Sequence, residues 1–221
     1  MQFELTDQEA YFLVRLARRA VENNLKDGTI ITPPGDTPEK LLKPMGVFVT
    51  INSIRANART LRGCIGFPYA VYPLARAVIE AAIESATRDP RFPPLSIDEL
   101  DHVVFEVSVL TEPELIRVSS PREYPSKVRV GIDGLIVERG FNKGLLLPQV
   151  PVEWGWNSEE FLCQCCMKAG LTPDCWVLPD TKIYRFSCIL LLELAPKGRI
   201  VMVDLRREGG FERLKEILGE K

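Results

Sequence analysis

Residues 46–66 read GVFVTINSIRANARTLRGCIG, and this stretch decides the class of fold. Its first part, residues 46–51, is β-branched and almost continuously apolar, which is typical of a buried strand. Residues 61–66 are predicted to form the neighbouring strand. Because strand and helix patterns do not alternate strictly along the chain, the sequence predicts an α+β fold with a mainly antiparallel sheet, not a doubly wound parallel fold.

Helices are predicted on either side of these strands, from apolar residues at helical spacing and from cap residues at the ends. They run from Thr6 to Gly28, from Pro73 to Asp89, from Asn157 or Ser158 to Gly170 and from Phe211 to Leu218. The second carries a face of small residues that suits close packing. The sheet is therefore predicted to be flanked by helices.

Further strands are predicted beyond the second helix. Residues 103–110 alternate as a strand with one buried face does, and residues 183–194 read as one last long strand. Between them, Asp133-Gly134 is a hairpin signal within residues 128–137, and residues 142–144 mark another turn. This middle region is predicted to be an antiparallel meander.

The composition is that of an ordinary globular protein. Its 221 residues suit a single domain over 1–221, with a smaller second lobe formed by part of the chain. The net charge is −2, and Lys and Arg are mixed with Asp and Glu along the chain. Non-specific nucleic-acid binding needs many cations on one face, so this pattern gives it little support.

The N-terminal sequence, the longest apolar run and the cysteines predict where in the cell the protein is found. No signal-peptide pattern opens the sequence, and the apolar run from Cys188 to Leu192 is far shorter than the ~20 residues that span a bilayer. The six cysteines, without an Asn-x-Ser/Thr sequon, predict reduced thiols and a cytoplasmic protein. Cys163, Cys165 and Cys166 are spaced poorly for zinc, so no metal site is predicted.

The most unusual string is Leu-Arg-Gly-Cys-Ile-Gly at residues 61–66. Glycines around Cys64 let backbone approach closely and expose the thiol, while Arg62 is placed to lower its pKa or to hold an anion. The alternative is that Cys64 is a small buried residue of a strand and that the glycines make room for a packed helix. Both interpretations stay open.

This string resembles the signature hexapeptide of the AMMECR1 family. Further blocks resemble the family in the same order: residues 89–95 (DPRFPPL), 106–110 (EVSVL), 146–150 (LLPQV) with 153–154 (EW), and 168–171 (KAGL). Together they cover nearly the whole chain. The resemblance implies an α+β fold with a main sheet flanked by helices, a smaller lobe, and the signature string near a cleft.

The resemblance does not imply a known activity or cofactor, because fold and kinship do not determine function. Some relatives occur fused or grouped with Memo-like and radical-SAM proteins, which implies a shared pathway. The sequence therefore leaves the presence of enzymatic activity open.

The candidate site residues are polar or reactive types beside Gly or Pro. Cys64 is the candidate catalytic residue. The candidate ligand-binding residues are Arg62, Gly63, Gly66, Asp89, Arg91, Gln149 and Glu153. The alternative for these polar residues is structural: Asp89 and Arg91 brace the end of the second helix, and Gln149 and Glu153 satisfy backbone groups of a loop.

Two other features receive mainly structural interpretations. His102 is the only histidine, and its place after Asp101 before a strand argues against its acting as a base for Cys64. Trp154, Trp156 and Trp176 are interpreted as packing aromatics, because basic residues are not interleaved with them as in single-strand binding.

Three functions follow from these residues. The leading one is a small-molecule-handling protein, catalytic or carrier-like, with a cleft around residues 61–66 and an anionic group held by Arg62 or Arg91. The second is a non-enzymatic module that docks another protein of the pathway, which would expose an apolar patch. The third and weakest is RNA binding around Arg55, Arg59 and Arg62.

Overall fold

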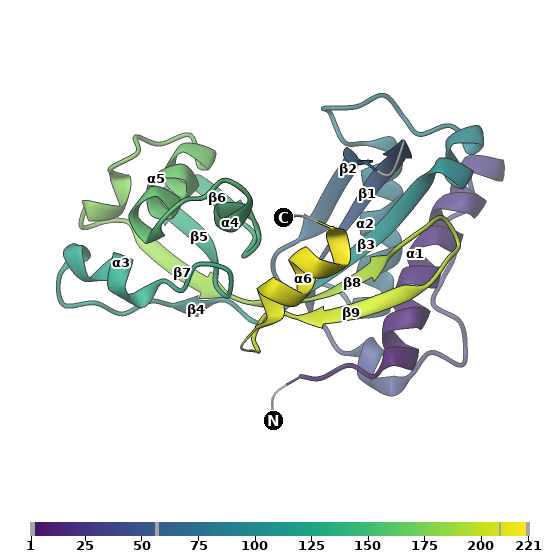
Figure 1. Cartoon of the computed structure of the whole chain (residues 1–221), viewed down its shortest axis with the longest axis horizontal. Coiled ribbons are helices and arrows are strands. Elements are labelled where there is room, and N and C mark those ends of the chain that lie inside the picture. The colour runs from purple at the N-terminus through teal and green to yellow at the C-terminus, as the bar shows by residue number, and fades with distance from the viewer. Residues whose placement is uncertain (1–2, 56–57, 208, 220–221) are drawn as a thin grey trace. The chain divides into compact units, whose positions relative to one another are not determined.

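The structure is a computed structural model that describes residues 3–55, 58–207 and 209–219 (Figure 1). Its internal contacts divide the chain into two compact units. Unit 1 comprises Met1–Thr111 and Ile189–Val203, and unit 2 comprises Glu112–Cys188 and Asp204–Lys221. Each unit is built around a sheet of its own. The prediction that the two form a single domain stays a prediction.

Unit 1 is built on a five-stranded sheet with strand order β2-β1-β3-β8-β9. The strands are β1 (Gly46–Arg55), β2 (Ala58–Phe67), β3 (Val103–Leu110), β8 (Cys188–Glu193) and β9 (Ile200–Asp204). The central strand β1 pairs antiparallel with both β2 and β3. The two stretches that opened the sequence analysis are therefore neighbours, and the predicted α+β class is confirmed.

Two long helices lie against one face of this sheet (Figure 1). They are α1 (Asp7–Asp27), which begins at a Thr6–Glu9 capping box and ends at the left-handed Gly28, and α2 (Leu74–Thr87), which begins after Pro73. Short 3-10 helices η1 (Glu39–Leu42) and η2 (Ile97–His102) complete the unit. Alternate strand residues such as Val47, Val49 and Ile51 pack with both helices into one core, as strand periodicity requires.

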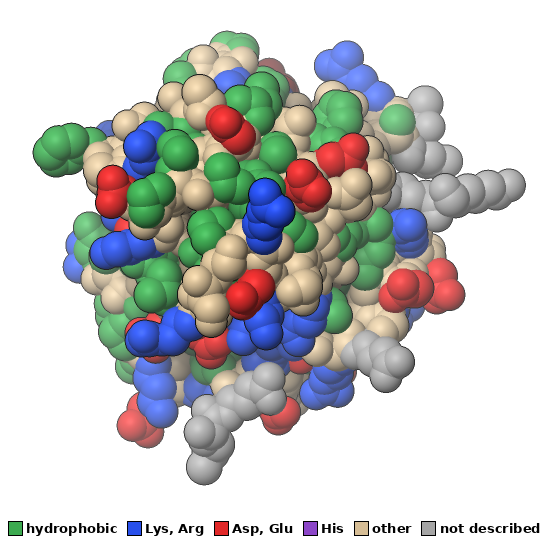
Figure 2. All heavy atoms as spheres, turned by 90° about the vertical axis from the view of Figure 1, so that its left-hand side faces the viewer, with side chains coloured by type: hydrophobic (Ala, Val, Ile, Leu, Met, Phe, Trp, Pro, Cys, Tyr) green, Lys and Arg blue, Asp and Glu red, His purple; other side chains and the backbone are tan. Residues whose placement is uncertain are grey.

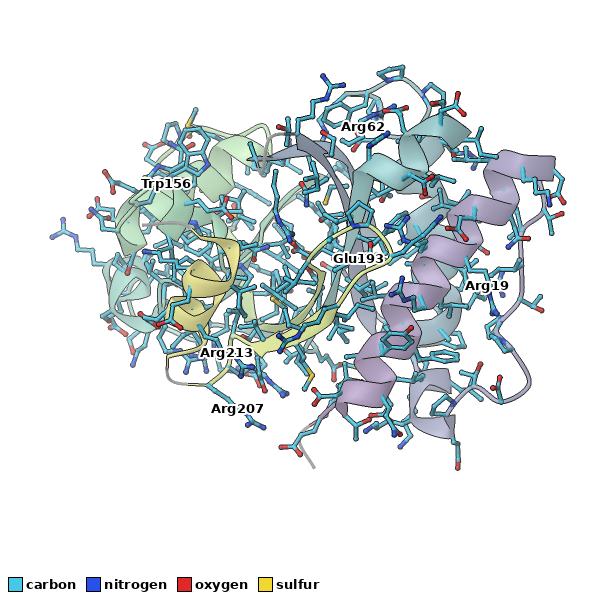
Figure 3. The ribbon with its side chains drawn as sticks, turned by 45° about the vertical axis from the view of Figure 1, so that its right-hand side comes forward. Arg19, Arg62, Trp156, Glu193, Arg207 and Arg213 are labelled. Atoms are coloured by element: carbon cyan, nitrogen blue, oxygen red, sulfur yellow. A yellow bond between two sulfur atoms is a disulfide. The ribbon has the colours of Figure 1, made fainter. Side chains whose placement is uncertain are left out.

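A buried ion pair connects α1 to the sheet. The Arg18 Nε donates to Glu193 Oε1 at 3.1 Å, and Arg18 also donates to the carbonyls of Leu100 and Val103. Glu193 (Figure 3) in turn accepts from the backbone amide of Phe105 at 3.1 Å. Both side chains are almost wholly buried, so the burial of charge is compensated by a complete set of partners.

Unit 2 holds a four-stranded sheet with strand order β4-β7-β5-β6. Its strands are β4 (Glu114–Leu115), β5 (Gly134–Arg139), β6 (Asn142–Leu146) and β7 (Lys182–Phe186), all paired antiparallel. Its helices are η3 (Pro121–Glu123), α3 (Tyr124–Lys127), α4 (Val150–Glu153), α5 (Ser158–Lys168), η4 (Cys175–Val177) and α6 (Gly210–Leu218). The core packs α5 and η4 against β5 and β7.

A disulfide joins Cys166 of α5 to Cys175 of η4. The prediction of reduced thiols is therefore wrong for this pair. The two cysteines are nine residues apart in sequence. The chain turns at Gly170, which has a positive φ, and η4 thereby comes to lie beside α5, which the sequence pattern did not reveal. Cys64, Cys163, Cys165 and Cys188 are not part of a disulfide among the described residues.

The predicted helices are confirmed, but two strand predictions and one turn prediction are wrong. Residues 142–144, expected to form a turn, begin β6, and the turn lies at residues 140–141. Residues 128–133 form turns, so Asp133-Gly134 starts β5 and is no hairpin turn; the buried Asp133 carboxylate instead accepts from Arg129. The single strand expected over 183–194 is two strands in different sheets, broken at Ser187. Ser187 donates its hydroxyl proton to the carbonyl of Ile132 at 2.7 Å.

Within the described ranges, no helix has the length and apolar character that crossing a membrane requires.

Candidate functional site

Cys64 stands in a row of three residues on neighbouring strands of unit 1. The register places Thr50 of β1 opposite Cys64 of β2 and also opposite Glu106 of β3. Since the flanking residues Val49 and Ile51 point into the helix-covered core, the row occupies the other face of the sheet. We call it the thiol face. The Thr50 hydroxyl lies 3.3 Å from the Cys64 sulfur and donates to it.

Asp89 and Arg91 hold the backbone of Cys64. The Cys64 amide donates to Asp89 Oδ2 at 2.8 Å, and Arg91 Nη2 donates to the Cys64 carbonyl at 3.3 Å. The two side chains also pair with each other through hydrogen bonds of 2.9 and 2.7 Å. They occupy backbone groups that the edge strand β2 would otherwise expose to another strand.

Arg62 sits at an irregularity of β2. The pairing shifts between Ile51, opposite Gly63, and Asn52, opposite Leu61, which leaves Arg62 as the extra residue of a bulge. The guanidinium of Arg62 (Figure 3) donates to both carboxylate oxygens of Glu99, at 2.8 and 3.0 Å, and to the carbonyls of Pro93 and Pro94. These four hydrogen bonds hold the Arg62 side chain against the segment around η2.

The two glycines of the hexapeptide allow close backbone approaches. A Cβ on Gly63 would collide with the carbonyl oxygen of Ser85 in α2, and one on Gly66 would collide with the backbone of Val47 and the ring of Phe48. The Ser85 hydroxyl donates to Val49 O at 2.7 Å and accepts from the amide of Ile65 at 2.8 Å. The small residue at 63 is therefore required for α2 to lie on the sheet.

The electrostatics of the row favour a neutral thiol. Burial raises the pKa of Cys64; the hydrogen bond from Thr50 opposes this, and the charge of Glu106 adds to it. This direction is opposite to the lowering predicted from Arg62, whose charge is taken up by Glu99. The pairing with Arg91 lowers the pKa of Asp89 to about 2, so this carboxylate stays charged at neutral pH.

Gln149 and Glu153 belong to unit 2, whereas the other candidate residues belong to unit 1. Gln149 precedes α4, and its Oε1 atom is buried and accepts no hydrogen bond from the described part of the chain. Glu153 ends α4 with an exposed side chain. His102 is exposed at the end of η2, and no hydrogen bond among the described residues joins it to Cys64.

Sequence reasoning missed Thr50 and Glu106 as site residues, and it named Arg59 only as part of a possible RNA-binding surface. Arg59 lies partly buried on β2 and donates to the carbonyls of Glu193 and Leu194; burial lowers its pKa, while the charges of Glu106 and Glu193 oppose the shift. Strand alternation was the available signal, because Thr50 and Glu106 interrupt apolar strands at alternate positions. Only the register shows that they form one row with Cys64, in which Thr50 lies between the other two residues.

Metal-ligating side chains are scattered over the part of the chain that the structure describes. No group of three or more His, Cys, Asp or Glu side chains there is arranged to hold an ion. The row instead offers a thiol, a hydroxyl and a carboxylate, which suit contacts with a polar organic molecule.

The fold and this row define an α+β protein of two sheet-based units with a thiol beside a carboxylate on one sheet. The family model described as AMMECR1 matches residues 14–191, so the chain belongs to the AMMECR1 family.

Several relatives share almost the whole chain. Protein PH0010 of Pyrococcus horikoshii is 58% identical over 201 residues, which are 90% of this chain and 97% of that protein. A protein of Thermococcus gammatolerans is 57% identical over 199 residues, with the same shares of the two chains. The crystal structure of PH0010, an uncharacterized protein, matches with a TM-score of 0.88 at 56% identity and covers 91% of this chain and 100% of its own.

Proposed function

We propose that the protein binds a small organic molecule on the thiol face of unit 1 and handles it as an enzyme or a carrier. The observation that carries this proposal is the partly buried Cys64, held by Asp89 and Arg91 through its backbone and aligned with Thr50 and Glu106. Bracing a strand needs the backbone contacts alone. It does not need a thiol, a hydroxyl and a carboxylate in one row.

The raised pKa of Cys64 limits the ways in which this thiol can act on a ligand. A thiol becomes a nucleophile only as the thiolate. Since Cys64 is neutral at rest, a covalent step requires a base, and Glu106 is the carboxylate of the row. Without such a step, the neutral thiol contacts the ligand as a weak hydrogen-bond donor in a carrier.

Of the two arginines that flank the thiol, Arg91 is the better candidate for an anionic group of the ligand. About half of its side chain is exposed, against 13% for Arg62. Arg62 also has four internal hydrogen bonds that a ligand would have to replace. In this proposal Arg62, Gly63 and Gly66 position β2, and Arg91 with Asp89 faces the ligand.

Alkylation of Cys64 as a function of pH tests the proposal. Intact protein is treated with iodoacetamide, and peptide mass spectrometry measures modification at each cysteine. We expect Cys64 to react in the folded protein with an apparent pKa above the ordinary value of roughly 8.5. In Glu106→Gln this pKa should fall, whereas Glu138→Gln, in unit 2, serves as the control. A thiol that reacts only after unfolding contradicts a ligand-facing Cys64.

We propose as a second candidate a surface for another protein, such as a Memo-like or radical-SAM protein of the same pathway. Unit 2 supports it with large hydrophobic side chains that are at least half exposed: Phe141, Trp154 and Met167. Figure 2 shows hydrophobic side chains reaching the surface on the side where α3 and α5 are drawn in Figure 1. Cross-linking in gentle lysates should recover one partner in near-equal amount; a protein that stays a lone monomer contradicts this candidate.

A further inference from the structure

A small groove runs beside the first turns of α5 in unit 2. It has a volume of about 240 Å³ and is lined by Trp156, Asn157, Glu159, Glu160, Cys163 and Gln164. Such a space accommodates one side chain and is below the usual size of a site for a drug-sized ligand. Its occupant is therefore a single group, whose chemistry the lining must select.

Trp156 lines the groove, and its indole stacks on that of Trp154, which is not one of the lining residues. The rings of Trp154 and Trp156 stack with centroids 6.0 Å apart and an interplanar angle of 16°. Trp156 (Figure 3) packs partly against the core of unit 2, whereas the side chain of Trp154 is 70% exposed. An indole this exposed adds little to folding, but it offers a flat face with negative potential.

The residues that line the groove carry negative charge only, from Glu159 and Glu160. The segment 144–167 that contains them has no Lys or Arg, and Lys143 and Lys168 flank it. None of the ion pairs among the described residues involves Glu159 or Glu160. The groove is therefore complementary to a cation.

The amides at the start of α5 are not available to an anion. Asn157 Oδ1 accepts from the amides of Glu159 and Glu160 at 2.9 and 3.0 Å, and Glu160 Oε2 accepts from the Asn157 amide at 2.8 Å. This capping box satisfies the helix terminus internally. The carboxylate of Glu159 is exposed and caps nothing in this box.

We propose that this groove docks an arginine side chain of another protein. The planar guanidinium lies against the indole pair, of which Trp154 is the largely exposed member, and pairs with the carboxylates of Glu159 and Glu160. Arginine fits because its flat, weakly hydrated cation stacks on aromatic rings and keeps its donors for carboxylates. The inference rests on the second proposed function, a surface for another protein, and supplies the chemistry of the partner segment.

The experiment uses the full chain and a blocked five-residue peptide of alternating Gly and Arg. Its counterpart has citrulline in place of Arg, which keeps the shape and removes the charge. Binding is followed by indole fluorescence and by amide chemical shifts of residues 154–164. The variants are Trp154→Ala and the pair Glu159→Gln with Glu160→Gln; Gln at 160 preserves the capping box. The control is Asp180→Asn, an exposed carboxylate of the same unit outside the groove.

We expect the arginine peptide to shift the amides of residues 154–164 and the citrulline peptide to bind at least about fivefold more weakly. Each groove variant should also weaken binding about fivefold or more, and Asp180→Asn should not change it. Equal binding of the two peptides, or unchanged binding in both groove variants, overturns the arginine site. If the peptides fail while cross-linking still recovers a partner, this inference falls and the second proposed function stands.

Discussion

The two units of this protein treat their polar and apolar side chains differently. In unit 1, Arg18 and Glu193 are both buried and satisfied, and the polar residues of the hexapeptide region are used to hold β2. In unit 2, the comparable pair Arg129–Asp133 has an exposed arginine, a disulfide closes the core, and Trp154 is left largely exposed. Unit 1 depends on buried polar contacts, and unit 2 combines a covalent link with an exposed aromatic surface.

The comparison shows that the most unusual sequence motif of the chain is not its most exposed surface. The hexapeptide at residues 61–66 is the most unusual string of the chain, yet Arg62 and Gly63 have full structural explanations. The region around Trp154 looked like ordinary packing, yet Trp154 does not pack inside. A residue's distinctiveness in the sequence and its availability to a ligand are separate properties.

The largest expected effect comes from the buried ion pair of unit 1. Arg18→Met leaves Glu193 charged and buried without its main partner, so we expect a loss of about 3–5 kcal/mol in the free energy of unfolding. Urea unfolding followed by circular dichroism measures it. Arg88→Met, which removes an exposed i,i+4 pair with Glu84, is the control and should cost less than about 0.5 kcal/mol. Similar losses in both variants would remove the distinction drawn for unit 1.

The disulfide of unit 2 should have the next largest effect. Opening the link between Cys166 and Cys175, nine residues apart, releases the unfolded chain and should cost about 2–3 kcal/mol. Thermal unfolding with and without reductant measures this loss, and the Cys166→Ser/Cys175→Ser variant should be insensitive to reductant. Cys163→Ser, which keeps the disulfide, should retain the response. Equal stability with and without reductant would mean that the link does not support unit 2.

Gly63 tests the structural interpretation of the hexapeptide. Gly63→Ala places a methyl group against the carbonyl of Ser85, and the overpacking should cost about 1–3 kcal/mol. Gly35→Ala, at a position with open space around it, should change stability by less than about 0.5 kcal/mol. Chemical denaturation compares the two. A stable Gly63→Ala protein would show that close approach of α2 does not explain this glycine.

The smallest effect concerns Asp89 and depends on pH. Because the folded pKa of about 2 lies below the ordinary value of 3.8, the stabilisation is complete above about pH 4 and is lost as the pH falls toward 2. At neutral pH, Asp89→Asn should therefore be less stable than the natural protein by about 1–2 kcal/mol. This gap should close between pH 4 and pH 2 in urea unfolding. Asp98→Asn, an exposed carboxylate, is the control, and a gap independent of pH would contradict the assigned role.

Much of the fold was open to prediction because its signals are local. Capping residues such as Thr6 and Asn157 satisfy amides within their own helix, so helix ends follow from a few neighbouring residues. The antiparallel pairing of residues 46–51 with 61–66 likewise follows from short-range order of two strands. The resemblance to the AMMECR1 family rested on several sequence segments that follow one another in the family's order. The match of the family model to residues 14–191 confirms this resemblance.

The candidate site was predictable only in part. Cys64, Asp89 and Arg91 were named from the sequence, and the structure brings them together because α2 returns its end to β2. Thr50 and Glu106 were missed because strand register aligns them with Cys64, and no local pattern encodes a relation between such distant segments of the chain.

The longer helices, the α+β class and the choice of Cys64 as a candidate site residue followed from the sequence, since each depends on neighbours along the chain. Tertiary structure alone decided that the apolar run 183–194 divides at Ser187 between two sheets, that Cys166 pairs with Cys175, and that Arg18 meets Glu193. Each of these depends on which segments meet in space. Such a contact stabilises the protein only when the fold brings both residues together, so the sequence around either residue does not reveal it.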